Sequence, residues 1–172
     1  MAPTARPSLA GLDPTRTNRR WAMERGQKQA VQAWEALFRS QVTLLRRFKA
    51  NFRTAEISLS EYDVLYNLTL FPGARLRLNE LNEHILLAQP SLSRLIERME
   101  SDGLVRRERD PADGRGTLVV LTEHGSVVQR RVGRAHADAI AAYVGGALDE
   151  EELRVLERLC NKLRAAQSSI AN

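Results

Sequence analysis

Small polar and basic side chains follow one another closely in the middle of the sequence. Ser91, Ser93 and Arg94 come directly after Gln89 and Pro90. Hydroxyl and amide groups can donate and accept hydrogen bonds at the edges of bases, and an arginine can hold a guanine with two hydrogen bonds. The chemistry that this segment favours is hydrogen bonding to base edges. The alternative is an ordinary solvated helix face that happens to hold serines.

A turn-forming cluster over residues 110–116 carries a lone cation. Arg115 stands between Gly114 and Gly116, so a slim backbone presents its guanidinium. An arginine on such a support fits a minor groove, which is narrow and electronegative in A·T-rich sequence. Asp113 can pair with Arg115 and orient it. The alternative is a turn in which Asp113 serves only the backbone.

The charge of this region is balanced. Residues 88–116 hold six basic and six acidic side chains, although the whole chain has a net charge of +5. The overall basic excess favours an anionic partner, but only modestly. Contacts to such a partner must therefore come from individual side chains and not from a continuous basic patch. The candidate cations are Arg94, Arg98, Arg106, Arg107 and Arg115.

Two short helices must position the polar segment. Gln89-Pro90 opens one of them, with the proline suited to the first turn, and Gly103 ends it. Its apolar face is Leu92, Leu95, Ile96 and Met99. The serines and Arg94 therefore face outward. A shorter helix precedes it, with Asn79 as the expected cap, an end near residue 87, and two inward residues, Leu81 and Ile85.

Residues 104–109 and 117–121 are rich in β-branched and alternating residues, which predicts a β-hairpin with residues 110–116 at its tip.

The rest of the chain has a helical period. One helix is expected over about residues 20–51, and a second starts with Ser58 and Glu61 as a capping box and ends at Pro72-Gly73. Thr122 caps a helix that Gly145-Gly146 interrupts, with Val127, Val128 and Val132 among its inward residues. Asp149 and Glu152 form a further capping box, before a stripe of Leu153, Leu156, Leu159, Cys160, Leu163 and Ile170.

Motifs in this order and spacing resemble the MarR family of bacterial regulators over about residues 21–163. The motifs that carry the resemblance are Leu76-Arg77-Leu78-Asn79-Glu80-Leu81, Gln89-Pro90-Ser91-Leu92-Ser93-Arg94-Leu95, Met99 to Arg107, Asp113-Gly114-Arg115 and Leu121-Thr122-Glu123-His124-Gly125.

The resemblance implies a mainly α fold with a small β-hairpin wing: a winged helix-turn-helix inside a helical dimerisation scaffold. Residues 1–19 are then expected as a flexible arm, residues 20–57 and 123–172 as the dimerisation region, and residues 58–122 as the DNA-binding lobe. The family's function implies a cytoplasmic homodimer on double-stranded DNA with a pseudo-palindromic operator, usually a repressor released by a small aromatic ligand or a stress signal. The DNA-contacting residues that we predict are Gln89, Pro90, Ser91, Ser93, Arg94, Arg98, Arg107, Asp113 and Arg115.

An aromatic ligand pocket is one interpretation of Trp34, Phe38, Tyr62 and Tyr66, although plain core is favoured for the same residues. Cys160 is the only cysteine, and its place on the apolar stripe favours a buried core or dimer-interface thiol over an oxidant sensor. The three histidines are widely spread, so no metal or other cofactor is expected. No membrane partner is expected either.

Other classes of function are weaker. A winged-helix module for protein interaction, or an architectural DNA binder without an effector, is the main alternative. No nucleophile–base pair, phosphate loop or metal spacing points to an enzyme.

Overall fold

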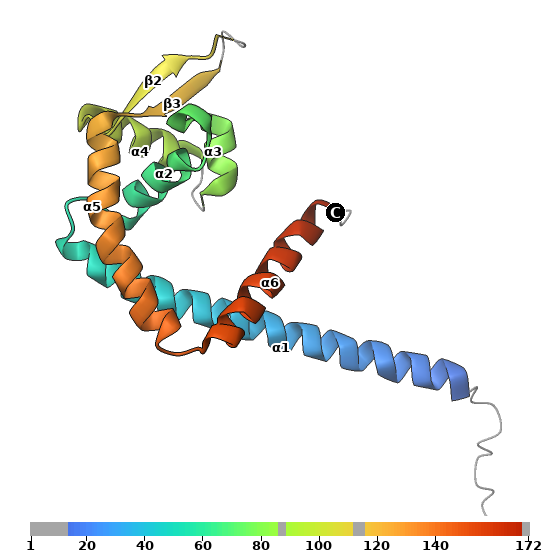
Figure 1. Cartoon of the computed structure of the whole chain (residues 1–172). Coiled ribbons are helices and arrows are strands. Elements are labelled where there is room, and N and C mark those ends of the chain that lie inside the picture. The colour runs from blue at the N-terminus through green and yellow to red at the C-terminus, as the bar shows by residue number, and fades with distance from the viewer. Residues whose placement is uncertain (1–13, 86–88, 112–115, 170–172) are drawn as a thin grey trace, which may run out of the picture. The chain divides into compact units, whose positions relative to one another are not determined.

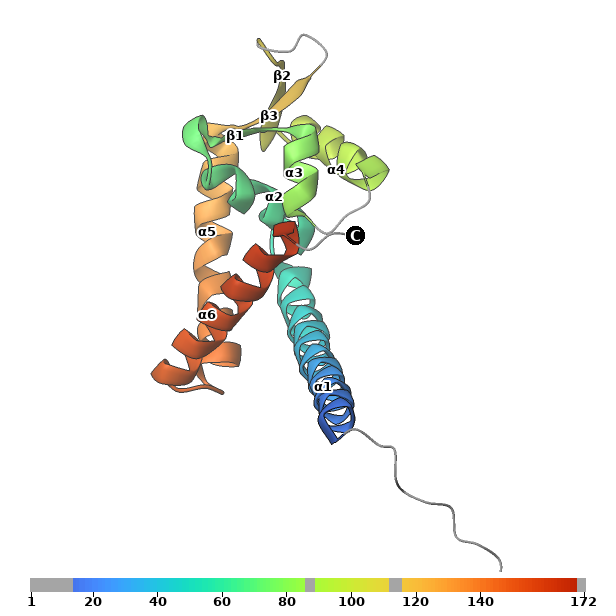
Figure 2. The ribbon, with the colours of Figure 1, turned by 90° about the vertical axis from the view of Figure 1, so that its right-hand side faces the viewer.

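The computed structural model describes residues 14–85, 89–111 and 116–169. The chain divides into two units, Met1–Leu45 and Arg46–Asn172, and each is described by itself. The α-helices and strands in chain order are α1 (Pro14–Asn51), α2 (Leu59–Thr69), β1 (Arg75–Arg77), α3 (Leu78–His84), α4 (Gln89–Ser101), β2 (Val105–Arg109), β3 (Thr117–Leu121), α5 (Glu123–Ile140) and α6 (Glu150–Ala166). Figure 1 labels all of them except β1, which is labelled in Figure 2. The mainly α fold with a small β wing is confirmed.

The first unit consists, as far as it is described, of the N-terminal part of α1. This helix begins at Pro14, so residues 14–19 of the expected arm are helical. Large apolar side chains recur along it at helical spacing and stay exposed within the unit: Val31 at 52%, Trp34 at 60%, Phe38 at 50% and Leu45 at 39%. This face therefore has no apolar partner within its own unit.

The second unit has its core between the short helices and the sheet. In both views α2, α3 and α4 lie on one side of the strands (Figure 1, Figure 2). The predicted inward residues of α4, together with Leu81 and Ile85, are all buried. Of the apolar face predicted for α2, Val64, Leu65 and Leu68 are buried, and Phe71 is half-buried against the same core. Periodicity therefore identified the core of this lobe correctly.

The sheet has three strands in the order β1-β3-β2, all antiparallel. The hairpin of β2 and β3 is confirmed, but β1 was not predicted. It is three residues long, Arg75 to Arg77, and only Leu76 is buried. A strand this short is below the length at which an alternating pattern can be recognised.

Helix caps follow the sequence closely, with one exception. The capping boxes of Ser58 with Glu61 and Asp149 with Glu152 are confirmed, and the Thr122 side chain accepts from the Gly125 N–H at 2.9 Å. The prediction of Asn79 as the cap of α3 is wrong. Arg77 caps that helix, because Glu80 stands three residues after it and accepts its N–H at 3.1 Å. The helix ends at His84, before the expected end near residue 87.

The apolar stripe of α6 is exposed within this chain. Leu156 is 40% exposed, Leu159 and Leu163 are 50% exposed, and Cys160 is exposed as well. A buried core thiol is therefore the wrong interpretation of Cys160, while a dimer-interface thiol stays a prediction. Val127 is also exposed, because its neighbour Val128 takes the buried position on α5. None of the helices in the described ranges is long and apolar enough to cross a membrane.

Candidate nucleic-acid interface

The polar face of α4 is set by the burial of its opposite face. Leu92 and Met99 have no exposed surface, and Ile96 is 1% exposed. The helix can therefore turn only one side outward. Of the predicted contacts, Pro90, Ser91, Arg94 and Arg98 are exposed and Ser93 is half-buried. The backbone of Gln89 opens the helix, and its side chain lies outside the described part of the chain.

The base of the hairpin is hydrogen-bonded up to the residues that flank its tip. Arg109 pairs with Thr117, and the Asp110 N–H donates to the Gly116 carbonyl oxygen at 3.0 Å. Asp113 and Arg115, which we predict to act at the tip, lie outside the described residues. Their contact with the minor groove stays a prediction.

An ion pair joins the base of the tip to β1. The Arg77 Nε donates to an Asp110 carboxylate oxygen at 2.5 Å, and the Asp110 side chain is only 5% exposed. A buried carboxylate needs such a partner because desolvation disfavours its charge. Sequence reasoning missed Arg77, since the strand that carries it was not recognised.

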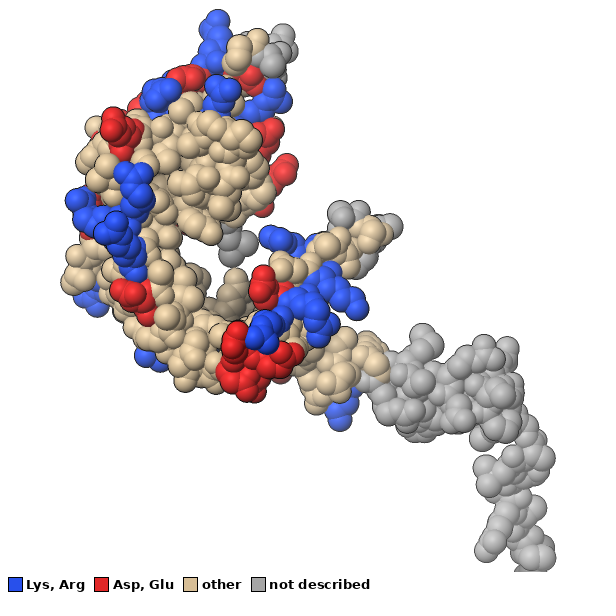
Figure 3. Space-filling model, viewed as in Figure 1, with Lys and Arg blue, Asp and Glu red and all other residues tan. Residues whose placement is uncertain are grey.

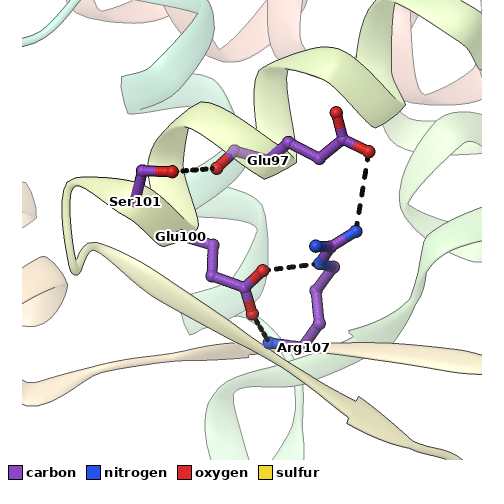
Figure 4. A network of polar contacts seen from close by, with 4 residues as sticks. All are labelled: Glu97, Glu100, Ser101 and Arg107. Atoms are coloured by element: carbon purple, nitrogen blue, oxygen red, sulfur yellow. Dashed lines mark hydrogen bonds and ion pairs between the residues drawn. The ribbon is translucent and has the colours of Figure 1, made fainter.

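A second polar network joins β2 to α4 (Figure 4). Glu100 accepts two hydrogen bonds from Arg107, one from the backbone N–H at 2.8 Å and one from Nε at 2.7 Å. Glu97 lies 3.7 Å from the same guanidinium, and its carbonyl oxygen accepts from the Ser101 hydroxyl at 3.0 Å. These hydrogen bonds lower the pKa of Glu100 below its usual value. Arg107, a predicted DNA contact, is therefore engaged within the lobe.

Charges of both signs lie around the strands of the lobe. Figure 3 shows blue and red atoms interleaved near the strands on the visible face. On β2, the Arg106 Nε donates to Glu108 at 2.6 Å. This agrees with the balanced charge of the segment and leaves individual cations, such as Arg94, to meet an anionic partner.

The four aromatic residues of the proposed pocket form two stacked pairs, one in each unit. Trp34 and Phe38 have ring centroids 5.9 Å apart, and Tyr62 and Tyr66 have theirs 6.1 Å apart. Plain core is the wrong interpretation within one chain for Trp34, Phe38 and Tyr66, which are 60%, 50% and 44% exposed. The ligand pocket that we predict from these four residues stays a prediction.

A histidine that sequence reasoning did not single out lies in an aromatic cluster of the second unit. The His136 ring meets Phe48, Phe52 and Tyr62 edge-on at centroid distances of 4.9, 5.3 and 5.1 Å. Its Nδ1 is buried and has no hydrogen-bond partner among the described residues. Burial lowers the pKa of His136 and raises the pKa of Tyr62. The signal was present, because His136 follows the buried Val128 and Val132 at intervals of four residues.

No three His, Cys, Asp or Glu side chains come together in the described ranges in a way that could hold a metal ion.

Comparison with known proteins shows which family this chain is similar to. A sequence model of the MarR family matches residues 56–116, which cover the helix-turn-helix and the start of the wing. The transcriptional regulator HosA of Escherichia coli O111:H- is 33% identical over 98 residues, which are 57% of this chain and 64% of HosA. The chain spans less than two thirds of the length of the first curated relatives that it matches.

Two solved structures from Streptomyces coelicolor match over more of the chain. AbsC, a MarR family transcriptional regulator, has a TM-score of 0.71 and 28% identity, covering 80% of this chain and 93% of AbsC. Sco3205, a MarR family transcriptional regulator solved in complex with DNA, has a TM-score of 0.69 and 29% identity, covering 83% of this chain and 88% of Sco3205. Its motifs, helix-turn-helix and wing stand in the order of the MarR family, and over 80% or more of its length the chain is similar to transcriptional regulators of that family.

Proposed function

We propose that the protein is a transcriptional regulator that binds double-stranded DNA sequence-specifically, as a homodimer on a pseudo-palindromic operator, and acts as a repressor. The observation that carries this proposal is the outward face of α4, where Ser91, Arg94 and Arg98 stand opposite a fully buried apolar face and beside the hairpin. Side chains on the first turns of such a helix can reach base edges in a major groove. The likeness to Sco3205, which was solved with DNA, supports this use of the lobe.

The proposal assigns two modes of reading. Ser91, Ser93 and Arg94 contact base edges in the major groove, and Arg115 enters the minor groove from the wing. Arg94→Ala should weaken binding by ~1–3 kcal/mol per half-site and relax the preference at one or two base positions. Arg115→Ala should instead remove the preference for A·T-rich flanks and leave the central bases of each half-site unchanged.

The test starts from a duplex selected out of a random-sequence library by the wild-type protein. Wild type and both variants are then titrated against the selected duplex, a flank-substituted duplex and random duplex at two salt concentrations. Binding should fall steeply with salt, because phosphate contacts release counterions. If wild type binds random duplex as tightly as any selected duplex, the architectural or protein-interaction alternative replaces this proposal.

The signal that releases the operator is proposed to be a small aromatic acid or phenol. The support is the stacked Tyr62–Tyr66 pair beside the aromatic cluster around His136. Salicylate and related phenolic acids should lower the affinity for the selected duplex and raise the melting temperature of the protein. Tyr62→Ala should abolish both effects. If no phenolic acid changes either the affinity for the duplex or the melting temperature, this part of the proposal is contradicted.

The named relatives are transcriptional regulators, which supports a binding role over a catalytic one. A cytoplasmic location is proposed on the same ground.

A further inference from the structure

One carboxylate links the recognition helix to the wing. Both oxygens of Glu100, in the last turn of α4, accept from Arg107 of β2, at 2.8 Å from the backbone N–H and at 2.7 Å from Nε (Figure 4). The side chains are 33% and 41% exposed, so the pair lies at the surface. Two bonds between one carboxylate and one residue fix direction as well as distance.

The backbone bond has a structural reason. β2 is an edge strand, since the sheet order is β1-β3-β2. Arg107 stands opposite Val119 of β3, yet its N–H donates to Glu100. An edge strand presents unpaired N–H groups that proteins must cover. Glu100 covers this one from the helix, so the end of α4 is tied to the edge of the sheet.

A tight turn between the end of α4 and the start of β2 limits motion close to the Glu100–Arg107 pair. The Leu104 N–H donates to the Met99 carbonyl oxygen at 2.9 Å, and Gly103 has the positive φ of 70° that this turn requires. The turn and the Glu100–Arg107 pair together hold β2 to α4 at two places. The direction in which the hairpin leaves the helix is then fixed.

We infer that Glu100 is a positioning residue for DNA reading, which sets the angle of the wing relative to α4, and that Arg107 is its partner. This inference rests on the proposed function, because it assumes that helix and wing meet one duplex in two grooves. Contacts that are held in place before binding lose less freedom on binding. If the wing is released from α4, the protein should therefore lose its preference for the native flanks of the site. The contacts of α4 with the central bases of each half-site should remain.

This inference and direct DNA contact by Arg107 predict opposite effects of one substitution. If Glu100 positions the wing, Glu100→Ala should weaken site preference although it removes a negative charge near DNA. If Arg107 is a DNA contact that Glu100 restrains, the same change should free the guanidinium and strengthen binding. The sign of the effect separates the two roles.

Three variants isolate the hydrogen bonds from the charge. Glu100→Ala removes both acceptors, and alanine keeps the helix propensity of this turn. Glu100→Gln removes the same charge but keeps an acceptor for the Arg107 N–H. Glu97→Ala is the matched control, since Glu97 is exposed, lies on the same helix and reaches Arg107 only at 3.7 Å. A cooperative thermal transition and a far-ultraviolet spectrum like that of wild type establish that each variant is folded.

The first readout is amide hydrogen exchange of the free protein, measured without DNA. Exchange of the Arg107 amide should accelerate roughly 5- to 10-fold in Glu100→Ala, as expected for the loss of one hydrogen bond. Glu100→Gln should lie between that variant and wild type, and Glu97→Ala should stay within about twofold of wild type. Unchanged protection in Glu100→Ala would overturn the inference.

The second readout is binding to the selected duplex, the flank-substituted duplex and random duplex. Glu100→Ala should lose preference for the native flanks by roughly 5- to 10-fold, the size of one lost base contact, while the preference for the central half-site bases remains. Glu100→Gln should recover part of the flank preference, and Glu97→Ala should keep all of it. Tighter binding or an unchanged flank preference in Glu100→Ala would overturn the inference. If wild type itself shows no preference among duplexes, the proposed function fails, and amide exchange still decides whether Glu100 holds the wing.

Discussion

At the scale of single residues, the lobe depends on charges that are held by neighbours. The Asp110 carboxylate is nearly buried, and Arg77 lies against it at 2.5 Å. Removing Arg77 takes an ionic partner away from a nearly buried carboxylate, and since Arg77 is 38% exposed, part of that cost is relieved by water. Arg77→Ala should therefore lower the free energy of unfolding by about 1–3 kcal/mol.

Arg75→Ala is the matched control for this prediction. Arg75 lies on the same strand, is exposed, and has no ion pair among the described residues. Its replacement should change the free energy of unfolding by less than about 0.5 kcal/mol. Urea unfolding measures both variants. Equal losses would mean that the Arg77–Asp110 pair contributes nothing beyond an exposed arginine.

His136 should make stability depend on pH. Burial lowers its pKa in the folded protein, so the unfolded chain takes up the proton at a higher pH. The neutral His136 ring makes its full contribution to the free energy of unfolding above the unfolded pKa of about 6.5. This contribution is lost as the pH falls from there toward the folded pKa.

His136→Phe keeps a ring in the cluster and removes the titration. Its urea midpoint should fall less than that of wild type between about pH 7.5 and pH 5.5, a window that starts above the ordinary histidine pKa. Parallel pH profiles of the two proteins would show that His136 does not titrate differently in the folded state.

At the scale of elements, the junction of β2 and α5 has no room for a side chain. A Cβ built on Gly125 would lie 2.0 Å from the Leu104 carbonyl oxygen and 3.0 Å from Leu121 Cδ1. The Thr122 N–H and hydroxyl both donate to that same carbonyl, at 3.2 and 3.0 Å. The start of α5 is therefore held, through the Leu104 carbonyl, to the residue that directly precedes β2.

Gly125→Ala should lower the free energy of unfolding by about 1–3 kcal/mol, although alanine favours a helix, because neighbouring backbone must move. Gly26→Ala is the control, since Gly26 is helical with nothing within 4 Å of the added Cβ. It should leave stability unchanged or raise it by up to about 1 kcal/mol. Thermal unfolding of both variants decides the matter, and a loss in Gly26→Ala as large as that in Gly125→Ala would contradict the steric argument.

Elements that show a helical period over many residues, or that begin with a local cap, could be predicted from sequence. Ser58 with Glu61 and the apolar face of α4 are local patterns, and both are found in the structure. β1 could not be predicted, because three residues pair with β3 from more than 40 positions away. The role of Arg107 could not be predicted either: its positive charge suggested a DNA contact, and only the fold shows that Glu100, seven residues before it, accepts its hydrogen bonds.

At the scale of the whole molecule, large apolar side chains remain exposed on two helices. Leu156, Leu159 and Leu163 recur on α6 at intervals of three and four residues, and Val31, Trp34 and Phe38 do so on α1. An apolar stripe of this kind on a soluble helix marks a surface that is covered by another chain. A second copy of this chain is the partner that the family implies, so we predict a homodimer at micromolar concentration.

Leu159→Lys should break this homodimer, because it places a charge in the middle of the α6 stripe. Leu70→Lys is the control, since Leu70 is 59% exposed, against 50% for Leu159, and lies at the end of α2. Sedimentation at micromolar concentration should give a monomer for the first variant and a dimer for the second. The monomer should bind the selected duplex about 100-fold or more weakly, because the two half-sites are no longer engaged together.

Cys160 reports on the same surface: a maleimide should react with it more slowly in wild type than in Leu159→Lys, since the dimer covers the thiol. A monomeric wild type, or equal thiol reactivity in both proteins, would show that α6 is not the dimer interface.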